Sequence, residues 1–570
     1  MKIPISIPAE TFRIRAIDVL VIFIVLGIIS FIIYIASEWG TPYEETLEIE
    51  LNPSNIPYYA LQSLARIFCA YILSLTFSIW YGYTASRSRI HEKIMIPLLD
   101  ILQSIPVLSF LPGVVLAMIA LFPGKRIGIE LACILLIFTG QVWNMTFSFY
   151  HSINTIPKEM KEVVKVFKFN KFSKFLRLDL PFSAIGLVWN SMMSVAGGWF
   201  FLMACEMFIL EDKDFRLPGL GSYIQTAANK GEIEYIVYGL GTMIFLIIIL
   251  DLFIWRPLIV WSQKFRIETV PPEEERESFV LNLFSGSIFI KKIIELISRT
   301  INQIEKLSYK RFSLAYSPVM NNISKILGFL FLMIVLISII WAIIKAIGLV
   351  SNVTLSDIVL IVKSAFYSLL RVFVALLIAL SWTLPVGVYI GLNPKAAKIL
   401  QGIVQIAASV PATAVFPVIL LFLIKLGGGL DIGAIFLMLL GTQWYLLFNI
   451  IAGASAIPKD LIEISKAYGI KGLRRWKVLI LPGIFPYLIT GLITASGGAW
   501  NSTIVSEYVS FGGEIMHTAG LGALISQSSA SGNFGLLLLA TCSMSLIVVG
   551  INRLLWKRLF IIAKAKYTLE

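Results

Sequence analysis

The sequence predicts an all-α membrane protein with about twelve transmembrane helices, arranged as two parallel repeats of six helices. Three observations support this fold class. Of the 570 residues, 58% are hydrophobic and 14% are charged, whereas soluble domains carry about 25% charged residues. Many apolar stretches approach the ~20 residues that a spanning helix needs. Rare residues also recur in the same order in both halves of the chain.

The clearest apolar runs cover residues 17–36, 131–150, 326–344 and 536–551. The first run is longer than the apolar part of a signal peptide, and no convincing small-x-small cleavage site follows it. It also has a counterpart near residues 323–349 of the second half. We therefore interpret it as a retained transmembrane span.

The net charge of +13 is distributed over short loops at alternate ends of the apolar runs. Basic residues follow the second predicted span at Arg87 and Lys93 and the fourth at residues 158–177, while the loop after the first span is acidic. The positive-inside rule then places both termini and the basic loops on the cytoplasmic side of the membrane. This pattern argues against nucleic-acid binding as the reason for the basic net charge.

The duplication covers most of the chain. Ser63, Arg66, Pro106 and Pro112 recur 305 residues later; from Trp143 to Trp255, equivalent residues lie 301 apart. An even number of spans per repeat gives both repeats the same orientation in the membrane. We predict a first repeat at 1–262 with spans one to six, and a second at 323–570 with spans seven to twelve.

Residues 263–322 form the predicted cytoplasmic linker between the repeats. The linker opens with a charged Pro-Pro-Glu-Glu-Glu-Arg-Glu segment at 271–277. Isoleucines then recur at helical spacing between 290 and 304, with basic residues between them. This pattern indicates an amphipathic helix on the membrane surface, serving as a structural tether, with binding of a target as the alternative.

Two cytoplasmic loops, 152–181 and 453–482, carry the most specific motif. Each has a Glu followed nineteen residues later by Pro, in the pairs Glu162 with Leu180-Pro181 and Glu463 with Leu481-Pro482. Gly469 follows Glu463 by six residues, at a position suited to a left-handed turn between two short amphipathic helices. This pattern resembles the coupling loop of ABC importer permeases. The resemblance implies an ABC importer permease fold in a prokaryotic inner membrane and docking of two ABC ATPase subunits, which would bind ATP and Mg.

The first loop departs from this pattern because Lys168 stands where the second loop has Gly469. Asn170, two residues later, is a candidate for the left-handed residue instead. We therefore expect the first loop to have a differently shaped turn and to bind its ATPase subunit differently.

Two arginines interrupt apolar spans, where a lone charge is unfavourable. Arg66 and Arg371 are expected at the same depth as Glu206 and Glu507, the single opposite charge that each has within reach in its own repeat. Our first interpretation is an Arg–Glu ion pair in each half. The alternative is that the arginines select an anionic substrate, because guanidinium binds anion oxygens bidentately.

Several further residues are candidates for the translocation pathway. Pro106 and Pro411 interrupt the third span of each repeat, which is tolerated where freed backbone groups line a cavity or are buried in protein. Trp199 and Trp500 each precede the intramembrane Glu by seven residues, and a Gly-Leu-Gly motif follows at 219–221 and 520–522. These features resemble permeases of the nitrate, taurine and aliphatic-sulfonate importers. That resemblance implies a small anionic substrate delivered by a separate external binding protein.

An enzymatic role is not supported by any motif. The phosphate-binding Gly-x-x-x-x-Gly-Lys-Ser/Thr loop is absent, and the three histidines and four cysteines lack metal-ligand spacing. We expect no cofactor or metal in this chain. Two alternatives to an ATP-driven permease remain at this point, an ion-coupled secondary transporter and a membrane anchor that transports nothing.

Overall fold

The computed structural model describes residues 16–42, 48–207, 209–210, 213–265, 278, 280–281, 287–311, 333, 336–337, 340–341, 343–351, 353–425, 429–511 and 514–566. It divides into two compact units. Unit 1 comprises residues 1–41, 148–189 and 249–336, and unit 2 comprises 42–147, 190–248 and 337–570. The units therefore cut across the two sequence repeats, because α5, α8 and α10 each begin in one unit and end in the other.

Helices form nearly all of the first repeat, because long apolar runs can satisfy their backbone groups internally only as helices when lipid surrounds them. The helices are α1 (Ala16–Trp39), α2 (Ile56–Ser86), α3 (Arg89–Ser104), α4 (Leu111–Leu121), α5 (Arg126–Asn154), α6 (Lys158–Val166), α7 (Lys171–Lys174), α8 (Leu180–Glu206), α9 (Leu220–Lys230), α10 (Ile233–Leu250) and α11 (Arg256–Ser262). Short 3₁₀ turns lie at Pro53–Asn55, Val107–Phe110 and Gln263–Phe265, and π-helical turns at Phe175–Asp179 and Asp251–Trp255.

The linker and the second repeat continue the pattern. Their helices are α13 (Ile288–Arg311), α15 (Leu355–Leu392), α16 (Pro394–Ser409), α17 (Ala412–Lys425), α18 (Leu430–Ser455), α19 (Lys459–Ala467), α20 (Gly472–Arg475), α21 (Leu481–Ser506), α22 (Leu521–Ala530), α23 (Phe534–Ile551) and α24 (Lys557–Lys566). π-Helical turns again precede α21, at Trp476–Ile480, and follow α23, at Asn552–Trp556. The two repeats thus place their π-helical turns at equivalent positions.

Each repeat also contains one short antiparallel hairpin just after its long fifth helix. The strands are β1 (Ile209–Leu210) with β2 (Lys213–Asp214), and β3 (Tyr508–Phe511) with β4 (Glu514–His517). The sequence did not predict these hairpins, because each strand is too short to show an alternating pattern. The hairpins connect α8 to α9 and α21 to α22.

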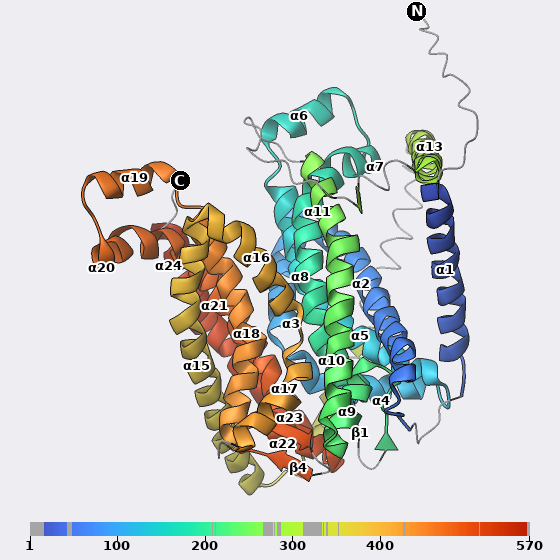
Figure 1. The fold of residues 1–570 in the computed structure, drawn as a ribbon, viewed down its shortest axis with the longest axis vertical. Helices are drawn as coiled ribbons and strands as arrows, with labels where there is room; N and C mark the ends of the chain where they lie inside the picture. Colours follow the sequence, from blue (N-terminus) through green and yellow to red (C-terminus); the bar gives the residue numbers. More distant parts are fainter. Residues whose placement is uncertain are drawn as a thin grey trace, which may run out of the picture. The chain divides into compact units, whose positions relative to one another are not determined.

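Within unit 2, α15, α18 and α21 run side by side (Figure 1). Figure 1 shows α19 and α20 at one end of these helices, and α22 with β4 at the other. The second coupling loop and the Gly-Leu-Gly segment therefore lie at opposite ends of α21. A helix of that length is about 39 Å long, which is enough to cross a membrane.

The third predicted spans are bent pairs of helices. Arg89–Gln103 and Val107–Leu121 meet at 84°, and so do Pro394–Ser409 and Ala412–Leu423. Pro106 and Pro411 lie at the breaks and are buried. A proline removes a backbone hydrogen-bond donor and clashes with the preceding turn, which explains why both helices end there.

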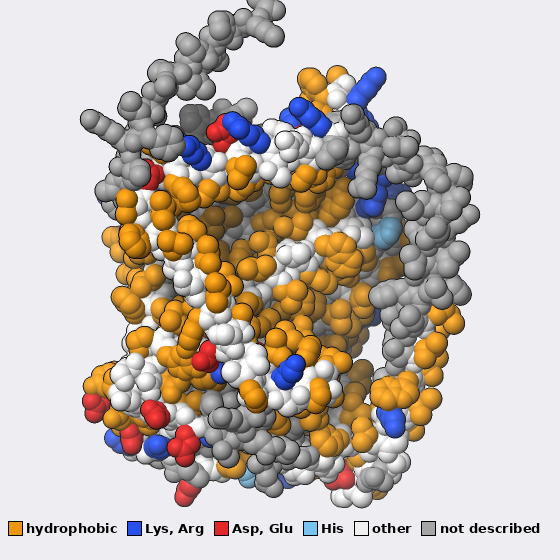
Figure 2. All heavy atoms as spheres, turned by 90° about the vertical axis from the view of Figure 1, so that its right-hand side faces the viewer, with side chains coloured by type: hydrophobic (Ala, Val, Ile, Leu, Met, Phe, Trp, Pro, Cys, Tyr) orange, Lys and Arg blue, Asp and Glu red, His pale blue; other side chains and the backbone are white. Residues whose placement is uncertain are grey.

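The described part of the chain contains nine helices long and apolar enough to span a membrane, or up to eleven if each bent pair is one span. The all-α membrane fold with two repeats of several spans is confirmed. Most of the span predicted near residues 323–349 lies outside the described residues. On the face drawn in Figure 2, hydrophobic side chains form a broad field in which charged side chains are sparse, as expected for a surface in contact with lipid.

Candidate functional sites

The first candidate site is a buried cluster around Arg66 of α2. Arg66 Nε and Nη2 donate to the two carboxylate oxygens of Glu130 on α5, at 2.6 and 2.8 Å. Arg66 Nη1 donates to Glu206 Oε1 at 2.6 Å and to the Pro218 carbonyl at 3.0 Å. All three charged side chains are completely buried. Buried charges persist in proteins when they are paired and hydrogen-bonded in this way.

The Gly-Leu-Gly motif wraps around the carboxylate of Glu206. The backbone N–H of Gly221, in the first turn of α9, donates to Glu206 Oε2 at 2.7 Å, so the carboxylate lies at the positive end of a helix. Ser63 donates to Glu206 Oε1 at 2.7 Å and accepts from the Leu220 N–H at 2.9 Å. A Cβ on Gly219 would lie 2.3 Å from the carboxylate. Only glycine leaves room for it at that position.

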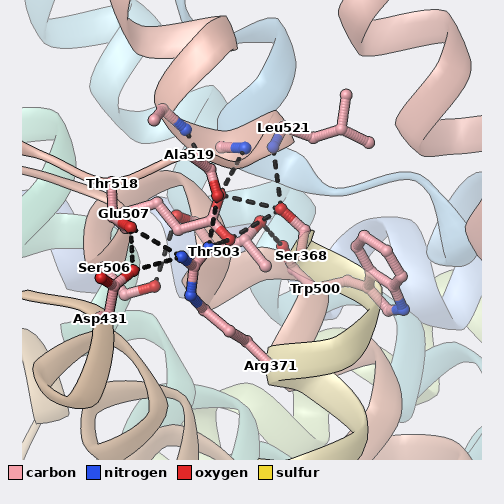
Figure 3. A network of polar contacts seen from close by, with 12 residues as sticks. Ser368, Arg371, Asp431, Trp500, Thr503, Ser506, Glu507, Thr518, Ala519 and Leu521 are labelled. Carbon is pink, nitrogen blue, oxygen red and sulfur yellow. Dashed lines mark hydrogen bonds and ion pairs between the residues drawn. The ribbon is translucent and has the colours of Figure 1, made fainter. Parts of the chain in front are cut away.

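The second repeat builds a similar cluster around Arg371 of α15 (Figure 3). Arg371 Nη1 donates to Glu507 Oε1 at 3.1 Å and to the Ala519 carbonyl at 2.7 Å. Arg371 Nη2 donates to Asp431 Oδ1 and to Thr518 Oγ1, both at 2.6 Å. Thr518 also donates to Asp431.

Glu507 is held by the second Gly-Leu-Gly motif in the same way. Ser368 Oγ lies 2.7 Å from Glu507 Oε1 and accepts from the Leu521 N–H at 2.8 Å. The Gly522 N–H donates to Glu507 Oε2 at 2.8 Å. A Cβ on Gly520 would lie 2.1 Å from this carboxylate. In both repeats, therefore, the same set of hydrogen bonds joins the short helix after the hairpin, α9 or α22, to the end of the fifth long helix.

The clusters differ in their charge and in their exposure. Arg126 donates to Glu130 at 3.1 Å, so that the first cluster has two arginines and two carboxylates and is formally neutral. The contacts described for the second cluster join one arginine to two carboxylates. Asp431, which occupies the position of Glu130, has a 74% exposed side chain, whereas Glu130 is buried.

Glu130 and Asp431 are functional candidates that the sequence reasoning missed. The expectation that each arginine has a single acidic partner is wrong, since each has two. The sequence does contain a signal for them. Glu130 and Asp431 lie 301 residues apart, which is the offset that relates the two repeats from Trp143 onward. Both stand just after the loop where the offset changes from 305 to 301, which obscured the correspondence.

The second candidate site is the pair of coupling loops. Glu162 lies on α6 and Glu463 on α19, and both side chains are exposed. Leu180-Pro181 and Leu481-Pro482 stand at the starts of α8 and α21, where they are half-buried. Each loop thus consists of two short helices and a π-helical turn that leads directly into the fifth long helix of the repeat.

The turns between the two short helices share one left-handed position, but the second loop has another left-handed residue, Gly472 at φ +55°, whose counterpart Lys171 lacks a positive φ. Gly469 has φ +64° and Lys168 has φ +51°, and both lie in the left-handed region. The Ile470 N–H donates to the Ser465 carbonyl at 2.9 Å, and the Phe169 N–H donates to the Val164 carbonyl at 3.1 Å. The first turn therefore matches the second at the left-handed residue and its hydrogen bonds, and differs from it at the start of the second short helix.

Asn170 is not the left-handed residue of the first loop. Its φ is −71°, and its side chain accepts from the Ser173 N–H at 2.6 Å as the N-cap of α7. Asparagine is a preferred N-cap residue. Its role here is to cap α7 rather than to form the left-handed turn. Lys168 takes the left-handed conformation although it has a Cβ, because the turn hydrogen bonds on both sides fix its backbone.

Apolar side chains on the coupling loops are exposed. Val163 and Phe167 are 53% and 68% exposed in the first loop, and Ile464 and Tyr468, at the equivalent positions, are 51% and 80% exposed. Leu473 of α20 is 81% exposed. Each loop therefore carries an apolar surface at its tip that nothing described in this chain covers.

The remaining pathway candidates are buried. Trp199 and Trp500 are each 1% exposed. Beside the first bend, the Val107 N–H donates to the side chain of Asn501 on α21 at 2.6 Å. This bond satisfies one backbone donor at the break in the first repeat with a side chain from the second repeat.

The fold and these sites define a multi-pass membrane protein built from a duplicated helical unit with one loop of coupling-loop geometry in each copy. Two stretches, residues 55–256 and 383–560, match the family described as binding-protein-dependent transport system inner membrane component. They cover more than half of the chain, and the chain therefore belongs to this family. The recognition of a duplicated permease is confirmed. Membership of a family of transport components also supports a non-enzymatic role.

Relatives align to part of the chain. The taurine transport system permease protein TauC of Escherichia coli (strain K12) is 28% identical over 158 residues, which are 28% of this chain and 54% of TauC. The nitrate import permease protein NrtB of Leptolyngbya laminosa is 28% identical over 189 residues, 33% of this chain and 63% of NrtB. The bicarbonate transport system permease protein CmpB of Synechocystis sp. (strain PCC 6803) is 30% identical over 126 residues, 22% of this chain and 44% of CmpB. The chain thus spans about half the length of these relatives.

Proposed function

We propose that this chain forms the translocation pathway of an ATP-driven ABC importer in a prokaryotic inner membrane, with both termini in the cytoplasm. One copy of the chain would serve as both halves of the permease. The observation that carries the proposal is the duplicated coupling loop, in which both copies have the same turn hydrogen bonds and lead into the fifth long helix. A symmetric pair of such loops suits a pair of ATPase subunits, which would bind the ATP and Mg.

The docking surfaces in this proposal are the exposed apolar side chains at the loop tips. An amphipathic helix that projects from the membrane can lie in a hydrophobic groove of a soluble partner. Phe167 and Tyr468 occupy equivalent positions and are the largest exposed apolar side chains of α6 and α19 with their following turns. We expect them to be the central contacts with the two ATPase subunits.

The substrate in this proposal is a small anion delivered by a separate binding protein. The relatives are named for taurine, nitrate and bicarbonate, which all carry an anionic group, and this supports a substrate with such a group. The geometry favours the structural interpretation of the arginines, because Arg66 and Arg371 each already bind two carboxylates. Selection of the anion is therefore assigned to other groups along the pathway.

An ion-coupled secondary transporter remains the alternative, and the buried carboxylates are the observation that would favour it. Protonation of Glu206 or Glu507 could in principle couple transport to a proton gradient. Both carboxylates accept from a helix N-terminus, a serine and an arginine, which favours a structural role. The two proposals differ in whether uptake stops when ATP hydrolysis is blocked.

The test uses affinity-tagged chain purified from its native membranes. Native mass spectrometry should show one copy of this chain with two ABC ATPase subunits, and uptake of candidate anions into proteoliposomes should require internal ATP. Gly469→Val should abolish uptake, because a β-branched residue is strongly disfavoured at positive φ, while Gly469→Lys repeats the residue of the first loop and should retain most of it. Uptake that continues without ATP, or normal uptake by Gly469→Val, would contradict the proposal.

A further inference from the structure

The linker helix α13 begins against the start of α1. Asp18 accepts from the Ser287 hydroxyl at 2.7 Å and from the Phe289 N–H at 3.1 Å through the same oxygen, Oδ1. This carboxylate therefore lies at the N-terminus of α13, where negative charge is favourable. Asp18 stands in the first turn of a helix that is apolar enough to span the membrane. The contact places the beginning of α13 at the membrane boundary.

The other end of α13 is joined to the first coupling loop. Arg177 donates from Nε to Glu305 Oε1 at 3.1 Å and from Nη2 to Glu305 Oε2 at 2.7 Å. Glu305 is buried, and the guanidinium of Arg177 holds the pKa of this carboxyl below its usual value. Arg177 precedes the start of α8 by three residues, at another membrane boundary.

These two attachments fix the direction of α13. The seventeen residues from Phe289 to Glu305 span about 24 Å of helix and connect the starts of two candidate membrane helices, both of which begin in unit 1. Figure 1 shows α13 nearly end-on beside the start of α1, so its axis is steeply inclined to that of α1. This orientation is the one expected for a helix lying along a membrane surface rather than crossing it.

One side of α13 carries an uncovered apolar stripe. Residues at helical spacing along it are exposed by 37–66%: Ile293, Ile294, Leu296, Ile297, Ile301 and Ile304. Lys291, Arg299 and Lys306 stand on the opposite side of the helix, and the 24 residues of α13 include six basic and two acidic residues. An apolar stripe with a basic excess is complementary to the headgroup region of an anionic leaflet.

We propose that α13 binds the surface of an anionic lipid leaflet and, through the Glu305–Arg177 pair, stabilises the first coupling loop but not the second. The second loop has Val478 at the position of Arg177, and that side chain is 60% exposed. Lipid binding would thus make the two coupling loops unequal. The inference goes beyond the proposed transport function, and its test needs neither an ATPase nor a substrate.

The first experiment identifies what covers the stripe. The photoreactive residue benzoylphenylalanine replaces Ile297 on the stripe or, as the matched control, Arg299 on the basic side, in the full chain in native membranes. Mass spectrometry should find a phospholipid adduct at 297 and about tenfold less at 299, because only the stripe reaches the acyl boundary. A cross-link from 297 to a protein would overturn the proposal.

The second experiment measures the effect on the loops by hydrogen exchange of the full chain in nanodiscs. Phosphatidylcholine alone is compared with an equimolar mixture of phosphatidylcholine and phosphatidylglycerol. The mixture should slow exchange in 158–179 by about fivefold and leave 459–480 unchanged. Glu305→Gln should abolish this difference, whereas Glu295→Gln, which loses only a pair within α13, should preserve it. Equal responses of the two loops, or no response in the first, would overturn the proposal.

Discussion

The left-handed residue of each coupling loop provides a matched pair of substitutions in one chain. Lys168→Gly removes a Cβ from a residue at φ +51°, and Gly469→Ala adds one at φ +64°. The two changes act on turns with the same hydrogen-bonding pattern and should have opposite effects on stability. Both residues are exposed, so loss or gain of packing contributes little.

The magnitude follows from backbone conformation alone. A Cβ on Gly469 would have nothing within 4 Å, so Gly469→Ala introduces no clash. A left-handed conformation costs a residue with a Cβ about 1–2 kcal/mol, and the stiffer unfolded chain offsets about 0.4–1 kcal/mol of that loss. Gly469→Ala should therefore destabilise the second loop by about 1 kcal/mol, and Lys168→Gly should stabilise the first loop by a similar amount.

Hydrogen exchange resolved by peptide reports both loops in the same sample. A change of about 1 kcal/mol alters local opening roughly fivefold. Lys168→Gly should slow exchange in residues 164–170 by that factor, and Gly469→Ala should accelerate exchange in 465–471, with the unmutated loop as internal control in each case. Faster exchange after Lys168→Gly would refute the reasoning. It would mean that contacts of the lysine side chain stabilise the loop by more than the left-handed backbone of Lys168 destabilises it.

Three further predictions concern the buried clusters and the assembly. Gly520→Ala should displace the carboxylate that lies 2.1 Å from the added Cβ and lower the thermal stability of the purified chain, whereas Gly497→Ala, where nothing lies within 4 Å, should not. Arg66→Met should leave buried Glu206 without a cationic partner and Glu130 with Arg126 alone, and destabilise the chain by about 3–5 kcal/mol, measured by denaturant unfolding in detergent; Arg66→Met with Glu206→Gln should recover part of this loss. Native mass spectrometry should find one copy of this chain per assembly, and two copies would contradict a pore formed by a single chain.

Much of the fold could be predicted because the physics is local. An apolar run of about twenty residues predicts a spanning helix without knowledge of its neighbours, and α1 and α23 lie where their runs indicate. The bends at Pro106 and Pro411 follow from the missing N–H of proline. The pairing of Arg66 with Glu206 was also inferred from depth alone, and the structure places their side chains 2.6 Å apart.

The rest depends on contacts between distant segments. The sequence shows the Gly-Leu-Gly motif but not its purpose, since the Glu206 carboxylate that excludes a Cβ at Gly219 comes from another helix. Similarly, propensity assigns the left-handed conformation to Asn170 rather than Lys168, because isolated asparagine tolerates it better. The backbone hydrogen bonds that end α6 and the capping of α7 by Asn170 override that preference.

Fusion of the two halves explains why they can differ. In a permease made of two identical subunits, any change in a coupling loop or charge cluster occurs in both halves. In this chain Arg177 binds Glu305 of the linker while its counterpart is Val478, and Glu130 is buried while its counterpart Asp431 is exposed. The features retained in both halves are the Arg–Glu pair, the Gly-Leu-Gly cradle and the left-handed turn. These shared features lie at the two ends of each fifth long helix. The Arg–Glu pair and the Gly-Leu-Gly segment are at one end, and the coupling loop with its left-handed turn is at the other. Attachment at both ends is what would allow a movement of the loop to be transmitted along the helix as a rigid body, so the divergent residues can adjust each half without interrupting that connection.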